Sequence, residues 1–114
     1  MSLSKDSLSP LLRQLAARNP FKEPELRIRP LEEASFEQDG GFAIWRWGAR
    51  HSADRPRATY LYNDADGTGL FLTLVGDASG ALKEVEIWRG DGQTAVRVPT
   101  TMEELSVATR GAVY

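Results

Sequence analysis

The carboxyl groups of Glu84 and Glu86 are the first candidates for chemistry in this sequence. Residues two apart on a strand share one face of a sheet, where paired carboxyls could flank a site and act as general acid and base. Acidic side chains on the solvent face of a sheet are far more common than such sites. We therefore favour an ordinary surface role for this pair.

The single histidine, His51, lies in a polar loop with Ser52 and Asp54. These residue types match the base, nucleophile and orienting acid of a catalytic triad, but triads draw their members from separate elements. Three side chains so close together in one loop do not readily adopt that geometry. A solvated loop histidine is the favoured interpretation, and no catalytic residue is predicted.

The acidic stretch Asn63–Gly67 invites a calcium interpretation. In an EF-hand loop the glycine takes the sixth position, which would place Tyr62 first and Thr73 last, where the ion requires carboxylates. With one histidine and no cysteine, a zinc site would need several clustered carboxylates. The stretch is therefore predicted to be a hairpin turn, and neither a metal nor a cofactor is expected.

Aromatic and arginine side chains gather on two successive predicted strands and on the loop between them. They are Trp45, Trp47, Tyr60 and Tyr62, with Arg46, Arg50, Arg55 and Arg57. An exposed aromatic patch rimmed by arginine has the composition of a protein-binding hot spot. Alternatively, residues 21–38 and the C-terminal tail fold over these aromatic rings, and the sequence does not decide between the two.

Composition limits the classes of function. The 114 residues carry a formal net charge of -2, which makes binding to a nucleic-acid backbone an unfavoured function. The chain has no cysteine, which favours a reducing compartment. It shows neither a secretory signal nor an apolar run long enough for a membrane span. We expect a cytoplasmic protein that does not enter membranes.

The spacing of apolar residues predicts a helix over residues 9–19. Ser9 can cap its first amides and Pro10 suits the first helical position, and leucines at helical spacing form one apolar stripe. Asn19-Pro20 ends it, because the residue before a proline avoids the α region.

From residue 40 the apolar residues alternate with a period of two between Gly/Asp-rich turns. Short turns join consecutive strands as hairpins. The sequence therefore predicts an antiparallel β-meander of four to five strands over about residues 42–98, with the N-terminal helix packed on one face. The chain (1–114) would form a single α+β domain with a weakly ordered tail at 106–114.

The alternation also assigns the two faces of this sheet. One is expected to be core and to carry leucines 70, 72 and 74 with Val85 and Ile87, while the tryptophans and tyrosines named above are expected on the other side. Leu82 has the wrong parity for the core face, so we predict a β-bulge near Lys83-Glu84.

Three motifs together resemble a family of small bacterial domains of unknown function. They lie at Glu37–Phe42, Tyr60–Gly67 and Leu82–Gly92, and their pattern is a glycine pair, a strand ending in an Asp-Gly turn, and an acidic strand followed by a tryptophan. The resemblance covers about residues 37–99. It implies a protein of a kind often encoded beside a bacterial toxin as its immunity partner, and it carries over no catalytic residues.

These features together predict a non-catalytic protein-binding module, most concretely a bacterial cytosolic immunity-type protein that neutralises a partner toxin. Two alternatives stay open. One is a small-ligand-binding or enzymatic domain that uses Glu84, Glu86 or His51 at a site between sheet and helix. The other is the subunit of a homo-oligomer.

Overall fold

A computed structural model describes residues 3–18 and 27–107 of the chain. The predicted N-terminal helix is α1 (Ser9–Arg18), which follows a 3-10 turn at Lys5–Leu8. Leu11, Leu12 and Leu15 are buried, as expected for an amphipathic helix that presents one stripe to a core. Asn19 and Pro20, at the predicted end of the helix, lie outside the described residues.

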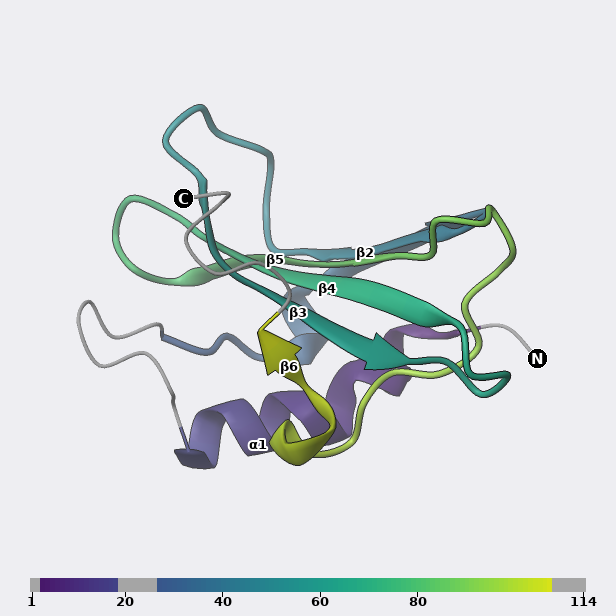
Figure 1. Cartoon of the computed structure of the whole chain (residues 1–114). Helices are drawn as coiled ribbons and strands as arrows, with labels where there is room; N and C mark the ends of the chain where they lie inside the picture. Colours follow the sequence, from purple (N-terminus) through teal and green to yellow (C-terminus); the bar gives the residue numbers. More distant parts are fainter. Residues whose placement is uncertain (1–2, 19–26, 108–114) are drawn as a thin grey trace.

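Six strands form one antiparallel sheet in the order β1-β2-β5-β4-β3-β6. They are β1 (Ser35–Asp39), β2 (Phe42–Arg46), β3 (Arg55–Asn63), β4 (Gly69–Gly76), β5 (Leu82–Trp88) and β6 (Ser106–Val107). Figure 1 shows α1 beneath one face of the sheet, which makes the fold α+β. Among the described residues, no helix lies on the opposite face.

The predicted number of strands, four to five, is wrong. β1 was missed because Phe36 is its single large apolar residue, so it shows little apolar alternation. β6 has only two residues and falls in the predicted tail, whose residues 108–114 lie outside the described part. Conversely, residues 93–98, the last part of the predicted meander, form no strand in the structure.

The sheet is only in part a meander. β3, β4 and β5 follow one another as hairpins, but β2 pairs with β5 and not with β3. Residues 47–54 carry the chain from β2 across to β3 on the far side of β4. Because this connection is longer than a hairpin turn, the rule that short turns join neighbouring strands does not apply to it.

The predicted core face is confirmed, because leucines 70, 72 and 74, Val85 and Ile87 are all buried, but the predicted placement of the aromatic residues on the opposite face is wrong. Trp45 pairs with Val85, and Tyr60 and Tyr62 pair with Leu72 and Leu70. Directly paired residues point to the same face, so these aromatic rings share the core face with the leucines. We call this side, which packs against α1, the inner face, and the opposite side the outer face.

The predicted bulge near Lys83-Glu84 is confirmed. Val75 pairs with Glu84, whereas Gly76 pairs with Leu82, so Lys83 is the extra residue on β5. An extra residue in a strand moves the side chains that precede it to the opposite face of the sheet. Leu82 therefore returns to the inner face and is buried, while Glu84 and Glu86 point to the outer face.

Candidate functional site

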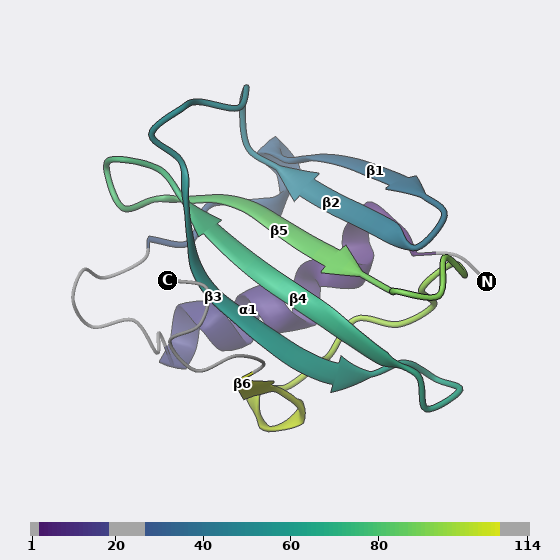
Figure 2. The same cartoon turned by 45° about the horizontal axis from the view of Figure 1, so that its top comes forward.

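The outer face carries a row of apolar side chains across four strands. Phe42 on β2 pairs with Trp88 on β5, Trp88 with Phe71 on β4, and Phe71 with Leu61 on β3. Trp88, Phe71 and Leu61 are 54%, 42% and 38% exposed. The rings of Phe42 and Trp88 meet edge to face, with their centroids 6.2 Å apart. We call these four residues the apolar row; Figure 2 looks onto this face, with α1 behind the sheet.

Acidic side chains border the apolar row. Asp39 pairs with Phe42 at the β1 edge, and Glu37 lies two residues before it. Asp66 lies in the turn between β3 and β4 and Asp91 in the turn after β5. All four acids are exposed. This end of the outer face therefore combines exposed apolar area with negative charge.

Glu84 occupies the opposite, basic end of the outer face and is buried. Its Oε2 accepts hydrogen bonds from Arg46 Nε at 3.1 Å and Arg50 Nε at 3.4 Å. Burial alone would raise the pKa of Glu84. The hydrogen bonds from Glu86 and Arg46 and the charges of both arginines outweigh burial and hold that pKa below its ordinary value. Glu84 is therefore ionised and fixed between two cations.

Glu86 behaves in the opposite way. Burial, the hydrogen bond to Glu84 and the charge of Glu84 together raise the pKa of Glu86 to about 7. The two carboxyls hold one proton between them up to neutral pH, which is a general property of adjacent acids. The pair is thus a proton-holding group at the centre of the outer face, flanked by Thr73, which pairs with Glu86 across β4 and β5.

Glu86→Gln should make the protein more stable at pH 8 than the wild type. A pKa of about 7 in the folded protein lies above the ordinary value in the unfolded chain, so the stabilising proton is fully present below about pH 4.5 and lost as the pH rises through 7. Glutamine keeps the neutral form at every pH. Urea unfolding should show the variant gaining about 1–2 kcal/mol over the wild type between pH 4.5 and 8, after allowance for solvent screening. Glu37→Gln, on the same face, corrects for the lost net charge, and a Glu86→Gln advantage that does not change with pH would contradict the assignment.

Three of the four aromatic residues predicted to bind a partner are core residues. Trp45, Trp47 and Tyr62 are buried, and each satisfies its polar atom on a backbone carbonyl. Trp45 Nε1 donates to Lys5 O at 2.9 Å, Trp47 Nε1 to Pro30 O at 2.7 Å, and Tyr62 Oη to Arg97 O at 2.9 Å. Tyr60 is half-buried against the same core.

Of the two alternatives for these aromatic residues, an exposed patch is therefore wrong, because the rings of Trp45, Trp47 and Tyr62 are covered. The N-terminal segment and α1 contribute to this cover, and so does the described part of the predicted residues 21–38, because Pro30 accepts the hydrogen bond of Trp47 and Phe36 packs on Trp45. Residues 108–114 of the tail lie outside the described part.

Only Phe42 joins the apolar row through the β2–β5 pairing, whereas Trp88, Phe71 and Leu61 meet across the β4–β5 and β3–β4 hairpins. Sequence reasoning missed the row because it placed Trp45, Tyr60 and Tyr62 on the exposed face, and the residues of the row have the opposite parity. The available signal was the alternation along β2, which places Phe42 and Ile44 on the opposite face from Trp45.

The four predicted arginines do not surround an aromatic patch. Arg46 and Arg50 meet at Glu84, as described above. Arg55 Nη1 donates to the carbonyls of Ser52 and Asp54, at 2.6 and 2.9 Å, and so holds its own loop. Arg57 is half-buried on β3. Arg46, which pairs with Glu84, and Arg50 give the outer face its basic end, away from the apolar row, whereas Arg55 pairs with Gly76 and so has the parity of the inner face.

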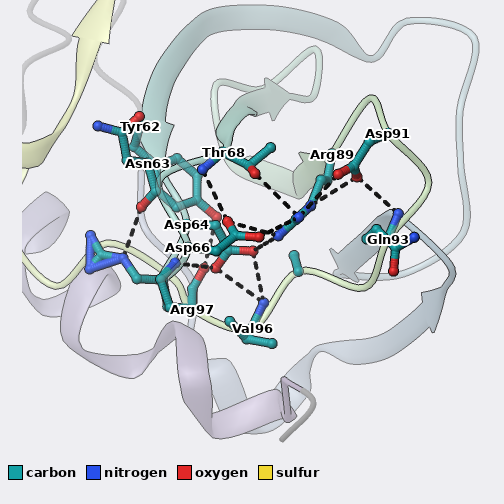
Figure 3. A network of polar contacts seen from close by, with 12 residues as sticks. Tyr62, Asn63, Asp64, Asp66, Thr68, Arg89, Asp91, Gln93, Val96 and Arg97 are labelled. Carbon is teal, nitrogen blue, oxygen red and sulfur yellow. Dashed lines mark hydrogen bonds and ion pairs between the residues drawn. The ribbon is translucent and has the colours of Figure 1, made fainter.

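The turns that carry the motifs of the sequence are joined by one buried cation, Arg89. As Figure 3 shows, its guanidinium lies among Asp64 and Asp66 of the β3–β4 turn and Asp91 of the following turn. The hydrogen bonds measure 2.7 Å from Nη1 to Asp64 Oδ2, 2.7 Å from Nη2 to Asp66 Oδ2 and 2.9 Å from Nε to Asp91 Oδ1. These contacts raise the pKa of Arg89 above its ordinary value, with the hydrogen bond to Asp91 contributing most.

Asp64 extends this network to the chain beyond β5. Its oxygens accept the Val96 amide at 3.3 and 3.2 Å, and Oδ1 accepts the Ala65 amide at 2.8 Å. Gly41 meets the same region, because a Cβ on it would lie 2.4 Å from the carbonyl oxygen of Arg89. The glycine pair, the Asp-Gly turn and the residues after the acidic strand are therefore parts of one structural unit, and the network fixes the end of the sheet that presents the apolar row.

The described residues contain no group of three or more histidine, cysteine or acidic side chains that could hold a metal ion. None of their helices has both the length and the apolar character that crossing a membrane requires.

A family model described as "Domain of unknown function (DUF6984)" matches residues 4–99. The match starts ahead of α1, so it includes the N-terminal part of the chain that the resemblance over residues 37–99 left out. No curated protein and no solved structure shows significant similarity to the chain.

Proposed function

The chain belongs to this family of domains of unknown function, and we propose that it is a non-catalytic protein-binding module whose partner docks on the outer face at the apolar row. The observation that carries the proposal is the exposure of Trp88, Phe71 and Leu61 in one continuous row. Contiguous exposed apolar area bordered by polar residues is typical of protein interaction sites, and tryptophan is the residue most enriched in their hot spots.

The charge around the row supports a partner with a basic surface. Glu37, Asp39, Asp66 and Asp91 are exposed at this end of the sheet, and complementary surfaces place opposite charges across an interface. We expect a partner protein with an apolar patch surrounded by lysine and arginine. In its most concrete form the partner is a basic toxin that the domain neutralises in the bacterial cytosol. The motif resemblance over residues 37–99 and the absence of cysteine support this form.

Two aspartate substitutions in the row test the proposal. A photoreactive phenylalanine analogue at Phe71 would first capture the partner in the native cell. The purified partner is then titrated with Phe71→Asp, Trp88→Asp and the double variant. Each substitution removes apolar contact area and places a hydrated carboxylate inside the interface. We expect these losses to outweigh the attraction between the new carboxylates and the partner's basic groups, so the affinity of the double variant should fall at least about 100-fold.

Val107→Asp is the matched control. Val107 is 67% exposed and pairs with Tyr60, so it has the parity of the inner face and lies outside the row. Its affinity should equal that of the wild type. Equal losses for Val107→Asp and Trp88→Asp would place the interface elsewhere. If the captured partner is a second copy of this chain, and sedimentation shows a dimer that the double variant breaks, the homo-oligomer replaces the partner protein.

A further inference from the structure

A pocket lies at the basic end of the molecule, apart from the apolar row. It has a volume of about 390 Å³, which is within the range of small-molecule sites. The loop after β2 forms one wall, and the β4–β5 turn with the bulge on β5 forms the other. The polar residues that line it are Arg50, His51, Asp54, Asp77, Ser79 and Lys83.

Internal hydrogen bonds fix the wall formed by the loop after β2. Asp54 Oδ2 accepts the His51 amide at 2.8 Å, and His51 Nδ1 accepts the Ala53 amide at 3.0 Å. Because Nδ1 is an acceptor, the proton of the neutral imidazole is on Nε2, which is left as a donor. The loop is therefore built before any ligand arrives, and its histidine has a defined tautomer.

The wall formed by the β4–β5 turn is held in the same way. Asp77 Oδ1 accepts the Ser79 amide at 2.9 Å, the Ser79 hydroxyl at 2.6 Å and the Ala81 amide at 3.0 Å. Arg27 Nη1 donates to Ser79 O at 2.6 Å. Both sides of the pocket thus hold their shape through contacts that leave other polar groups unused.

The unused groups are complementary to an anion that carries a donor. The ammonium of Lys83, which the bulge re-aims, has no hydrogen bond or ion pair with a described residue, and Arg50 uses only Nε, on Glu84. Asp54 Oδ1 is enclosed and accepts no hydrogen bond from the described residues. An enclosed oxygen without a partner is costly, and a ligand donor would relieve that cost.

We propose that this pocket binds a small ligand in which a phosphate or carboxylate group lies beside an ammonium or hydroxyl group. Arg50, Lys83 and His51 Nε2 take the oxyanion, since guanidinium and ammonium groups form the stronger, charge-assisted hydrogen bonds to such oxygens. Asp54 Oδ1 takes the donor. The ligand site would be additional to the partner surface, and it differs from the predicted site between sheet and helix.

The test is an NMR titration of the full chain with O-phosphoserine, aspartate and inorganic phosphate. We expect saturable shifts in the amides of the two pocket walls, from O-phosphoserine if the oxyanion is a phosphate and from aspartate if it is a carboxylate. Lys83→Gln should weaken that binding at least about 10-fold. Asp54→Asn should remove the advantage of O-phosphoserine over inorganic phosphate, because the one asparagine oxygen stays on the His51 amide and a donor NH2 group then faces the ammonium in place of an acceptor.

Two controls keep the outcome decisive. Arg29→Gln removes a half-buried cation outside the pocket and should leave the affinity unchanged. Trp88→Asp should do the same, so that this site and the partner surface are tested separately. Equal weakening by Arg29→Gln and Lys83→Gln would show non-specific attraction and overturn the proposal. So would the absence of saturable shifts with all three probes up to about 10 mM, a concentration that detects even weak specific binding.

Discussion

Asp64→Ala should destabilise the folded protein by about 3–5 kcal/mol, the usual effect of removing one partner from a buried ion pair. The side chain of Asp64 is fully buried and meets Arg89, which is also buried. The substitution leaves the guanidinium with less compensating charge and strips the Ala65 and Val96 amides of their acceptor. Since small domains have total stabilities of about 5–15 kcal/mol, a large part of the population should unfold at moderate urea concentrations.

Asp66→Ala is the matched control for this prediction. Asp66 accepts hydrogen bonds from the same guanidinium, but its side chain is 55% exposed. Water can replace it, so the loss of stability should be much smaller than for Asp64→Ala. The measurement is the urea midpoint of both variants at pH 7, with unchanged dependence on urea concentration. An equal loss of stability in the two variants would show that the burial of Asp64 does not make its ion pair with Arg89 more stabilising than that of Asp66.

The second large effect concerns the two faces of the sheet. Trp45 is completely buried and its ring lies 4.7 Å from that of Phe36, centroid to centroid. Trp45→Ala should cost about 3–5 kcal/mol, because it leaves a large cavity and also removes the hydrogen bond to Lys5 O. Trp88→Ala should cost only about 1 kcal/mol, the scale of an edge-to-face contact such as the one with Phe42.

Local features of the fold could be predicted from the sequence. The helix followed from its leucine spacing, although Ser9, the predicted cap, has helical backbone angles, and the Asp-Gly turns followed from their residue types. The bulge followed from one parity conflict, at Leu82, because each strand face is a strict alternation that a single extra residue breaks. All of these depend on neighbours along the chain.

Pairing between distant strands could not be predicted in the same way. Trp45 faces Val85, and Phe42 faces Trp88, only because β2 crosses over and joins β5. A change of partner or register moves a whole set of side chains to the other face. The predicted site therefore contained Trp45, Trp47 and Tyr62, which are core, and lacked Phe42, Phe71 and Trp88, which lie on the outer face.

The buried network was hidden for a related reason. The Asp-Gly turn at Asp64–Gly67 and the Arg89-Gly90-Asp91 turn each have the composition of an ordinary hairpin turn. Their joint role depends on the ends of β3 and β5 lying close enough for one guanidinium to contact three carboxylates. These motifs therefore belong to the structure of the domain more than to its chemistry.

The central claim is that the inner face folds the domain and the outer face is left free for a partner. Urea unfolding of Trp45→Ala and Trp88→Ala, side by side, tests it without any knowledge of the partner. The account predicts a midpoint far below the wild type for Trp45→Ala and one close to the wild type for Trp88→Ala. A loss for Trp88→Ala as large as that for Trp45→Ala would contradict it, because the Trp88 ring would then be part of a packed core and the apolar row could not receive another protein.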